Sequence, residues 1–214
     1  MYRQVDFNFN LTSMTHPITY LALGDSYTIG EKLELTENFP WQVVSIMREH
    51  GINIDAPDIV AKTGWTTDEL ADGIRKTKLA ASYSFVSLLI GVNDQYRGRT
   101  VSEYRPAFET LLERAIEFAG NISSHVVVLS IPDWGATPFA SDRDRAAIAR
   151  DIDAFNSANK EISISKKVHY LSVTAGTRES ANDPSMLAED GLHPSGILYR
   201  SWAVMIANIF ESLR

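Results

Sequence analysis

The 214-residue sequence contains no cysteine. Without thiols the chain can form no disulfide, no zinc–thiolate site and no iron–sulfur cluster, and it has no cysteine nucleophile. The absence does not identify a compartment, because proteins without thiols occur on either side of a membrane.

Long apolar runs and an excess of basic residues are also lacking. No segment approaches the roughly 20 apolar residues of a membrane span, and residues 1–17 lack the basic-then-apolar order of a secretion signal. The 20 basic and 27 acidic residues give a formal charge of −7, which disfavours nucleic acid or an anionic membrane as the main partner. We therefore expect a cytoplasmic protein; a chain whose signal peptide had been trimmed would have the same sequence.

The composition that remains is typical of one globular domain. Apolar residues make up 44% of the chain and charged residues 22%, and no low-complexity linker divides the sequence into two parts. Residues 1–17 show little periodicity and end in Pro17, so we expect them to form a loosely ordered arm. Residues 18–214 are expected to form a single domain.

Short apolar segments alternate with helical patterns along that domain. The predicted strands are residues 18–23, 58–61, 85–90, 126–130 and 168–173. Helical spacing of apolar residues lies between and after them, over residues 39–50, from 66 or 67 onward, and over 102–119, 141–162 and 194–213. A polar segment, 174–190, precedes the last helix. This order predicts an α/β fold with right-handed crossovers, a mainly parallel five-stranded sheet and helices on both faces.

Loops that follow strands share one edge of such a sheet, where open α/β folds carry their sites. Ser26 comes directly after the first predicted strand, but its hydroxyl is a weak nucleophile unless a base removes the proton. Among the five histidines only His193 is predicted at the same edge. The others are expected to be surface or capping residues: His16, His50, His125 and His169.

A carboxylate and three oxyanion donors are predicted at this edge as well. Asp190 can reach the inner ring nitrogen of His193, fix its tautomer and stabilise the imidazolium. Acyl transfer develops an oxyanion, for which the backbone N–H groups of Ser26 and Gly64 and the side-chain amide of Asn93 are candidate donors. Each donor follows a different predicted strand.

Four short blocks carry a resemblance to a known family. They are GDSYT at 24–28, KTGWTT at 62–67, GVND at 91–94 and DGLHPS at 190–195. These blocks resemble the signatures of the GDSL esterases, the SGNH hydrolase family, in the family's order and over most of the chain. Each block alone is a weak signal, whereas four in order with matching spacings are specific.

The resemblance implies roles for five residues. Ser26 would be the nucleophile, Asp190 and His193 would complete the triad, and Gly64 and Asn93 would join the Ser26 N–H in an oxyanion hole. It also implies a flavodoxin-like three-layer α/β/α sandwich, strand order 2-1-3-4-5, no metal and no cofactor. We therefore expect a serine hydrolase that cleaves small-molecule carboxylic esters through an acyl-enzyme. A short-chain ester, a lysophospholipid, a thioester and a sugar acetate would all suit this machinery.

Two positions depart from the family pattern. Tyr27 stands where the family name has leucine, a minor change because only the backbone N–H and the turn geometry matter there. Trp65 follows Gly64 where a smaller residue is frequent, and we predict that it narrows or walls the substrate cleft. Trp134 and Phe139, in the loop after the fourth strand, are candidate walls of an acyl pocket, with buried loop packing as an equal alternative.

Charged residues near the blocks are expected to be structural. Asp25 and Asp94 are short carboxylates beside turns, which commonly accept hydrogen bonds from nearby backbone N–H groups. Arg97 and Arg99 are expected on a solvated surface, the alternative being contact with an anionic substrate.

The alternative function is a non-catalytic module that binds flavin or carbohydrate on the same fold. The hydroxyl-bearing run at residues 26–28 is a short version of a loop that binds flavin phosphate. Flavin binding, however, gives no reason for Asp190 and His193.

Overall fold

The computed structural model of the protein describes residues 16–181 and 183–214. The first 15 residues of the predicted arm lie outside this range, so the arm stays a prediction. All five predicted strands form, as β1 (Tyr20–Asp25), β2 (Asp58–Lys62), β3 (Phe85–Leu89), β4 (Val126–Leu129) and β5 (His169–Leu171). They pair in parallel in the order β2-β1-β3-β4-β5, which confirms the order that the resemblance implies.

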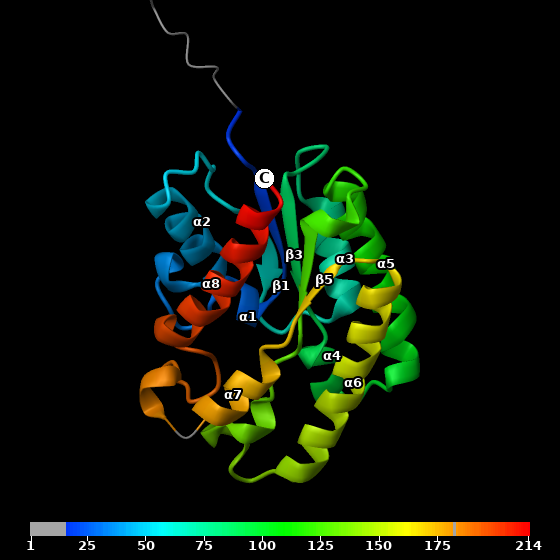
Figure 1. Cartoon of the computed structure of the whole chain (residues 1–214). Coiled ribbons are helices and arrows are strands. Elements are labelled where there is room, and N and C mark those ends of the chain that lie inside the picture. The colour runs from blue at the N-terminus through cyan, green and yellow to red at the C-terminus, as the bar shows by residue number, and fades with distance from the viewer. Residues whose placement is uncertain (1–15, 182) are drawn as a thin grey trace, which may run out of the picture.

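Helices cover both faces of the sheet, as expected for parallel strands (Figure 1). The helices are α1 (Ser26–Ile29), α2 (Phe39–Glu49), α3 (Thr67–Lys76), α4 (Val92–Tyr96), α5 (Val101–Phe118), α6 (Arg145–Ser165), α7 (Thr174–Ser180) and α8 (Gly196–Ser212). Helices α2 and α8 pack together on one face, and α3, α5 and α6 pack on the other. This arrangement confirms the three-layer sandwich. None of the helices in the described residues is long and apolar enough to cross a bilayer.

The register of the central strands decides where the loops emerge. Asp25 of β1 pairs with Lys62 of β2, and Gly24 pairs with Leu89 of β3. The three strands therefore end side by side, and the segments that follow them begin at one edge of the sheet.

Several element boundaries differ from the prediction. Helix α6 begins at Arg145 rather than near 141, because two short 3₁₀ turns, Trp134–Ala136 and Pro138–Ala140, precede it and Asp144 caps it. The segment 174–190 contains α7 and a 3₁₀ turn. Pro194 lies outside α8, whose N-cap is Ser195. The short helices α1 and α4 were not predicted, since one turn is too short to show a helical period.

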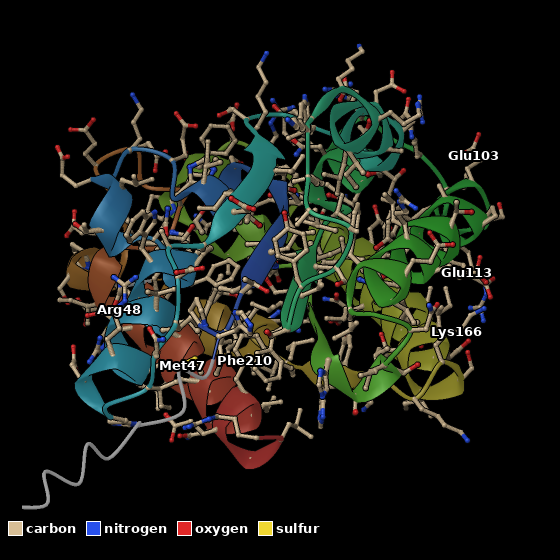
Figure 2. The ribbon with its side chains drawn as sticks, turned by 90° about the horizontal axis from the view of Figure 1, so that it is seen from above. Met47, Arg48, Glu103, Glu113, Lys166 and Phe210 are labelled. Atoms are coloured by element: carbon tan, nitrogen blue, oxygen red, sulfur yellow. The ribbon has the colours of Figure 1, made fainter. Side chains whose placement is uncertain are left out.

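The layer formed by α2 and α8 is held by large buried side chains. Figure 2 shows Met47 of α2 and Phe210 of α8 close together, and both are fully buried. The Phe210 ring stacks on Phe85 of β3 at a centroid distance of 4.1 Å. On the other side of the sheet Lys166 lies 2.6 Å from a carboxylate oxygen of Glu113, which ties α6 to α5 at the surface.

Removal of a large side chain from this layer should destabilise the fold. Trp202 of α8 is 1% exposed and contacts the rings of Phe39 and Tyr199. We expect Trp202→Ala to lower the free energy of unfolding by about 3–5 kcal/mol, because the cavity left behind cannot fully collapse. Urea denaturation measures the change. Val204→Ala, in the same helix but 42% exposed, should stay within about 0.5 kcal/mol of wild type.

Candidate active site

Three side chains that were predicted separately form one hydrogen-bonded chain. His193 Nε2 lies 2.9 Å from Ser26 Oγ, and His193 Nδ1 lies 2.7 Å from Asp190 Oδ2. Ser26 and His193 are each only 5% exposed. The structure therefore brings a hydroxyl, an imidazole and a carboxylate into line at the edge where β1 ends.

A sharp turn from strand to helix positions Ser26. Strand β1 ends at Asp25 and α1 begins at Ser26, with Asp25 Oδ1 accepting a 3.0 Å hydrogen bond from the Tyr27 N–H. The turn needs glycine at position 24, since a Cβ there would lie 2.5 Å from the Leu89 carbonyl oxygen. The hydroxyl of Ser26 thus projects from the first residue of a helix rather than from a loop.

The loop that carries His193 is built around the Asp190 carboxylate. Asp190 Oδ1 accepts 3.0 Å hydrogen bonds from the backbone N–H groups of Leu192 and His193. The Ala188 N–H donates to the His193 carbonyl at 2.8 Å, which closes the loop. The Tyr27 ring lies 4.9 Å from the His193 ring and packs against it. The orientation of the imidazole is therefore set by its own loop and by the neighbouring aromatic ring.

The ionisation of Asp190 decides which nitrogen of the His193 ring carries the proton. Partial burial acts to raise the pKa of Asp190, but hydrogen bonds from the His193 ring and from two backbone N–H groups hold that pKa below its usual value. An ionised carboxylate can only accept hydrogen bonds, so the proton of a neutral His193 is on Nδ1. Nε2 then accepts from the Ser26 hydroxyl, which is the arrangement that a general base requires.

Two of the three predicted oxyanion donors follow the neighbouring strands, Gly64 in the turn after β2 and Asn93 in α4 after β3. Gly64 has φ +81° in a turn closed by a 3.2 Å hydrogen bond from the Trp65 N–H to the Lys62 carbonyl, a conformation that favours glycine. Asn93 Nδ2 donates to the Trp65 carbonyl at 3.0 Å and lies 3.4 Å from Asp25 Oδ2. The Asn93 amide thereby links α4 both to the Gly64 turn and to the end of β1.

Ser26, Gly64, Asn93 and His193 border one cavity of about 210 Å³. Its other lining residues are Tyr27, Thr63, Val92, Tyr96, Trp134, Phe139 and Leu192. Most of these other lining residues are aromatic or aliphatic. A wider hollow of about 590 Å³, beside the C-terminal ends of α3 and α5, contains none of the predicted site residues.

Trp134 and Phe139 line the cavity, whereas Trp65 does not. The Trp65 ring packs instead against Gly73 of α3, where a Cβ would overlap it. The interpretation of Trp65 as a cleft wall is therefore corrected: the small residue at position 73 leaves room for the indole on the far side of the turn. Trp65 contacts the predicted site through its backbone, whose carbonyl accepts a hydrogen bond from the Asn93 amide.

Tyr96 is a cavity residue that the sequence analysis missed. Its ring lies 5.1 Å from that of Trp134, whose Nε1 donates to Gln95 Oε1 at 2.8 Å. Trp134 is buried, while Tyr96 is 49% and Phe139 45% exposed, so these two rings form the mouth of the cavity. The signal that could have found Tyr96 is its place three residues after Asn93, in the segment that follows β3.

Arg97 and Arg99 were both expected on a solvated surface. Arg99 departs from this expectation because it is only partly exposed and pairs with a buried carboxylate. Arg99 Nη1 lies 3.0 Å from Asp94 Oδ1 and 2.8 Å from Asp68 Oδ1. Asp94 is fully buried and also accepts from the N–H and hydroxyl of Thr67, at 3.0 and 2.8 Å. Burial raises the pKa of Asp94, against these hydrogen bonds and the Arg99 charge. The cluster joins the segment after β3 to the start of α3, the structural role expected for Asp94.

Asp25 is the buried carboxyl directly behind the nucleophile. Loss of solvent, with the nearby Asp94 charge, raises its pKa to about 8, although hydrogen bonds from the Tyr27 N–H and the Asn93 amide oppose the shift. Asp25 accepts the bonds expected of a structural carboxyl. Within residues 16–181 and 183–214 no cluster of three or more His, Asp or Glu side chains could hold a metal ion.

Comparison with known proteins gives one family. A model of the GDSL-like lipase/acylhydrolase family matches residues 22–200. Comparison with curated proteins returned no match.

Solved structures share the fold at low identity. A lipase/acylhydrolase from Enterococcus faecalis is 20% identical with a TM-score of 0.69, over 89% of this chain and 94% of that one. Axe2, an acetylxylan esterase from Geobacillus stearothermophilus, is 17% identical with a TM-score of 0.70, over 90% and 94%. TesA is 16% identical with a TM-score of 0.68, over 92% and 99%.

The raised pKa of Asp25 predicts a pH-dependent stability. Between the pKa of an unfolded aspartate, about 3.9, and the folded value of about 8, the folded state holds a proton that the unfolded state releases. The Asp25 contribution is therefore complete below about pH 4 and is lost as pH rises toward 8. Asp25→Asn cannot release this proton, so the stability of the variant relative to wild type should increase between pH 5 and 8, on the order of a few kcal/mol.

Urea denaturation at pH 5, 6, 7 and 8 checks this expectation. Asp142→Asn removes a carboxylate from the exposed surface and should leave the wild-type pH dependence unchanged. Parallel pH profiles for Asp25→Asn and wild type would contradict the proton-binding argument, whatever their constant offset.

Proposed function

The chain belongs to the GDSL-like lipase/acylhydrolase family and is an ester hydrolase; we propose that it cleaves short-chain carboxylic esters through an acyl-enzyme formed on Ser26. One observation carries the proposal: the hydrogen-bonded chain from Asp190 through His193 to Ser26. The alternative function, binding of flavin or carbohydrate without catalysis, does not account for these hydrogen bonds between Asp190, His193 and Ser26.

Acylation begins with the transfer of the Ser26 hydroxyl proton to His193 Nε2. Oγ attacks the carbonyl carbon of the ester, and the carbonyl oxygen becomes an oxyanion. The N–H groups of Ser26 and Gly64 and the Asn93 amide supply donors to that oxygen. Collapse of the intermediate breaks the bond to the alcohol oxygen, which takes the proton from His193 and departs.

Deacylation repeats these steps with water in place of Ser26. His193 takes a proton from the water, the resulting hydroxide attacks the acyl carbon, and the same donors stabilise the oxyanion. The bond to Ser26 Oγ breaks, and the proton on His193 returns to the serine as the carboxylic acid leaves. Asp190 stays ionised throughout and stabilises the imidazolium formed in each half-reaction.

The cavity supports a small acyl group as substrate. Its volume of about 210 Å³ lies below the range of roughly 300–1,000 Å³ typical of pockets for drug-sized ligands. Among the residues that line the cavity, Val92, Trp134 and Leu192 are apolar or aromatic, and no Asp, Glu, Lys or Arg of the described residues lines it to pair with a charged substrate. An acetyl group, which the named substrate of Axe2 carries, is of the size that such a cavity accommodates.

Substitution of Ser26 tests the nucleophile. Ser26→Ala should lower kcat for p-nitrophenyl acetate by about 10⁴-fold or more and should abolish labelling by a fluorophosphonate. Ser45→Ala removes a hydroxyl that is exposed on α2 and should keep wild-type rates and labelling. Labelling that persists in Ser26→Ala would assign the reactive hydroxyl to another residue.

A chain-length series tests the size of the acyl site. We expect kcat/KM for p-nitrophenyl esters to be greatest between acetate and butyrate and to fall at least tenfold by octanoate, because the longer chain exceeds the cavity. Phe139→Ala should raise the octanoate-to-acetate ratio by opening the mouth. Ile122→Ala, which removes an exposed apolar side chain before β4, should leave the ratio unchanged. A rate that increases with chain length, or hydrolysis restricted to thioesters or acetylated xylo-oligosaccharides, would contradict the short-chain ester assignment.

A further inference from the structure

Arg97, the residue at the C-terminal end of α4, reaches across to the loop that carries Gly64. Its Nη2 atom donates to the Gly64 carbonyl oxygen at 2.5 Å. The same guanidinium lies 3.1 Å from Glu69 Oε2 on α3. Glu69 in turn accepts a 2.9 Å hydrogen bond from the Thr66 N–H at the start of that helix. One side chain thus connects the end of α4 with the Gly64 turn and with α3.

The Gly64 turn needs such contacts to hold one conformation. Glycine populates positive and negative φ about equally, so its own preference does not select the φ of +81° found here. Two carbonyl groups of the turn are held from outside, that of Gly64 by Arg97 and that of Trp65 by Asn93. The Gly64 N–H and C=O lie in adjacent peptide planes that meet at the Gly64 Cα. Fixing the carbonyl side of the turn from outside therefore restricts rotation about this Cα, and with it the direction of the N–H.

Arg97 is not among the residues that line the cavity. Its charge is already paired with Glu69, and its side chain is 48% exposed. A role in binding an anionic substrate would make that anion compete with the Glu69 carboxylate for the guanidinium. The exposed ion pair with Glu69 contributes only about 0–1 kcal/mol to the stability of the fold. The hydrogen bond to the Gly64 carbonyl is a separate contact, and it lies beside a predicted oxyanion donor.

We propose that Arg97 is a positioning residue for the oxyanion hole. It holds the Gly64 N–H at a constant place relative to the Asn93 amide, which lies in α4, the short helix that Arg97 caps at its C-terminal end. The inference rests on the proposed function and adds a residue that acts on the reaction through Gly64. A planar guanidinium suits this task because it can donate to a carbonyl and a carboxylate at once, which a single ammonium does less well.

The experiment compares Arg97→Ala, Arg97→Lys and a matched control. Arg105→Ala removes an arginine of α5 that is 45% exposed and bonded to Glu161, away from the cavity. With p-nitrophenyl acetate, Arg97→Ala should lower kcat about 10- to 100-fold with KM within about twofold, because misplaced donors stabilise the transition state less than the bound ester. Arg97→Lys should recover part of the loss, and Arg105→Ala should match wild type.

A second readout separates positioning from a general loss of structure. A phenylboronic acid adduct on Ser26 mimics the tetrahedral intermediate and uses the same donors. Its inhibition constant should increase in Arg97→Ala by about the factor by which kcat/KM falls, while the melting temperature stays close to wild type. If Arg97→Ala fails to fold, the same comparison on Arg97→Lys decides.

The outcomes distinguish this inference from the proposed function. Wild-type kcat and boronate affinity in Arg97→Ala, together with an inactive Ser26→Ala, would overturn the positioning role alone. A rise in KM confined to anionic esters, with kcat unchanged, would replace it with substrate recognition. Wild-type hydrolysis by Ser26→Ala would instead overturn the proposed function.

Discussion

Parallel pairing of β1 with β2 on one side and β3 on the other is the constraint on which the site depends. The register places the last residues of these strands side by side, so the next residues of all three emerge together. The strands are buried between two helical layers, and a shift of register by one residue would turn every side chain to the opposite face and disrupt its packing against the helices. The core packing and the strand register therefore fix the spacing of Ser26, Gly64 and Asn93.

Polar contacts then set the orientation within that spacing. Asn93 bonds the Trp65 carbonyl, Asp94 accepts from Thr67, and Asp25 holds the turn that begins at Ser26. The first two contacts join segments more than 25 residues apart in the chain: Asn93 and Trp65 are 28 positions apart, and Thr67 and Asp94 are 27 apart. Catalysis by preorganised donors requires this rigidity, because donors that must reorient during the reaction lose much of their effect.

Burial of the Asp25 carboxyl beside Ser26 disfavours its ionised form. Asp25 lies where a charge is poorly solvated, and its raised pKa reports this effect. A carboxyl that is protonated below about pH 8 still accepts the Tyr27 N–H and so keeps the helix cap. The small cavity in front of Ser26 is also lined mainly by apolar and aromatic side chains, and hydrogen bonds to a developing charge are stronger there than in water.

The amino-acid sequence by itself determined the order of strands and helices, the edge at which the site lies, and the residue types that meet there. Alternating apolar periods specify elements, and Asp190 fixes His193 through contacts three residues apart, so local pattern was sufficient for both. Only the tertiary structure decided which aromatic rings line the cavity. The Trp65 ring packs against Gly73 of α3 instead, and the Tyr96 ring lines the cavity. The tertiary structure also decided that Arg97 contacts Gly64. The reason is physical, since the direction of a side chain depends on the packing of segments that are distant in sequence, and no local period encodes it.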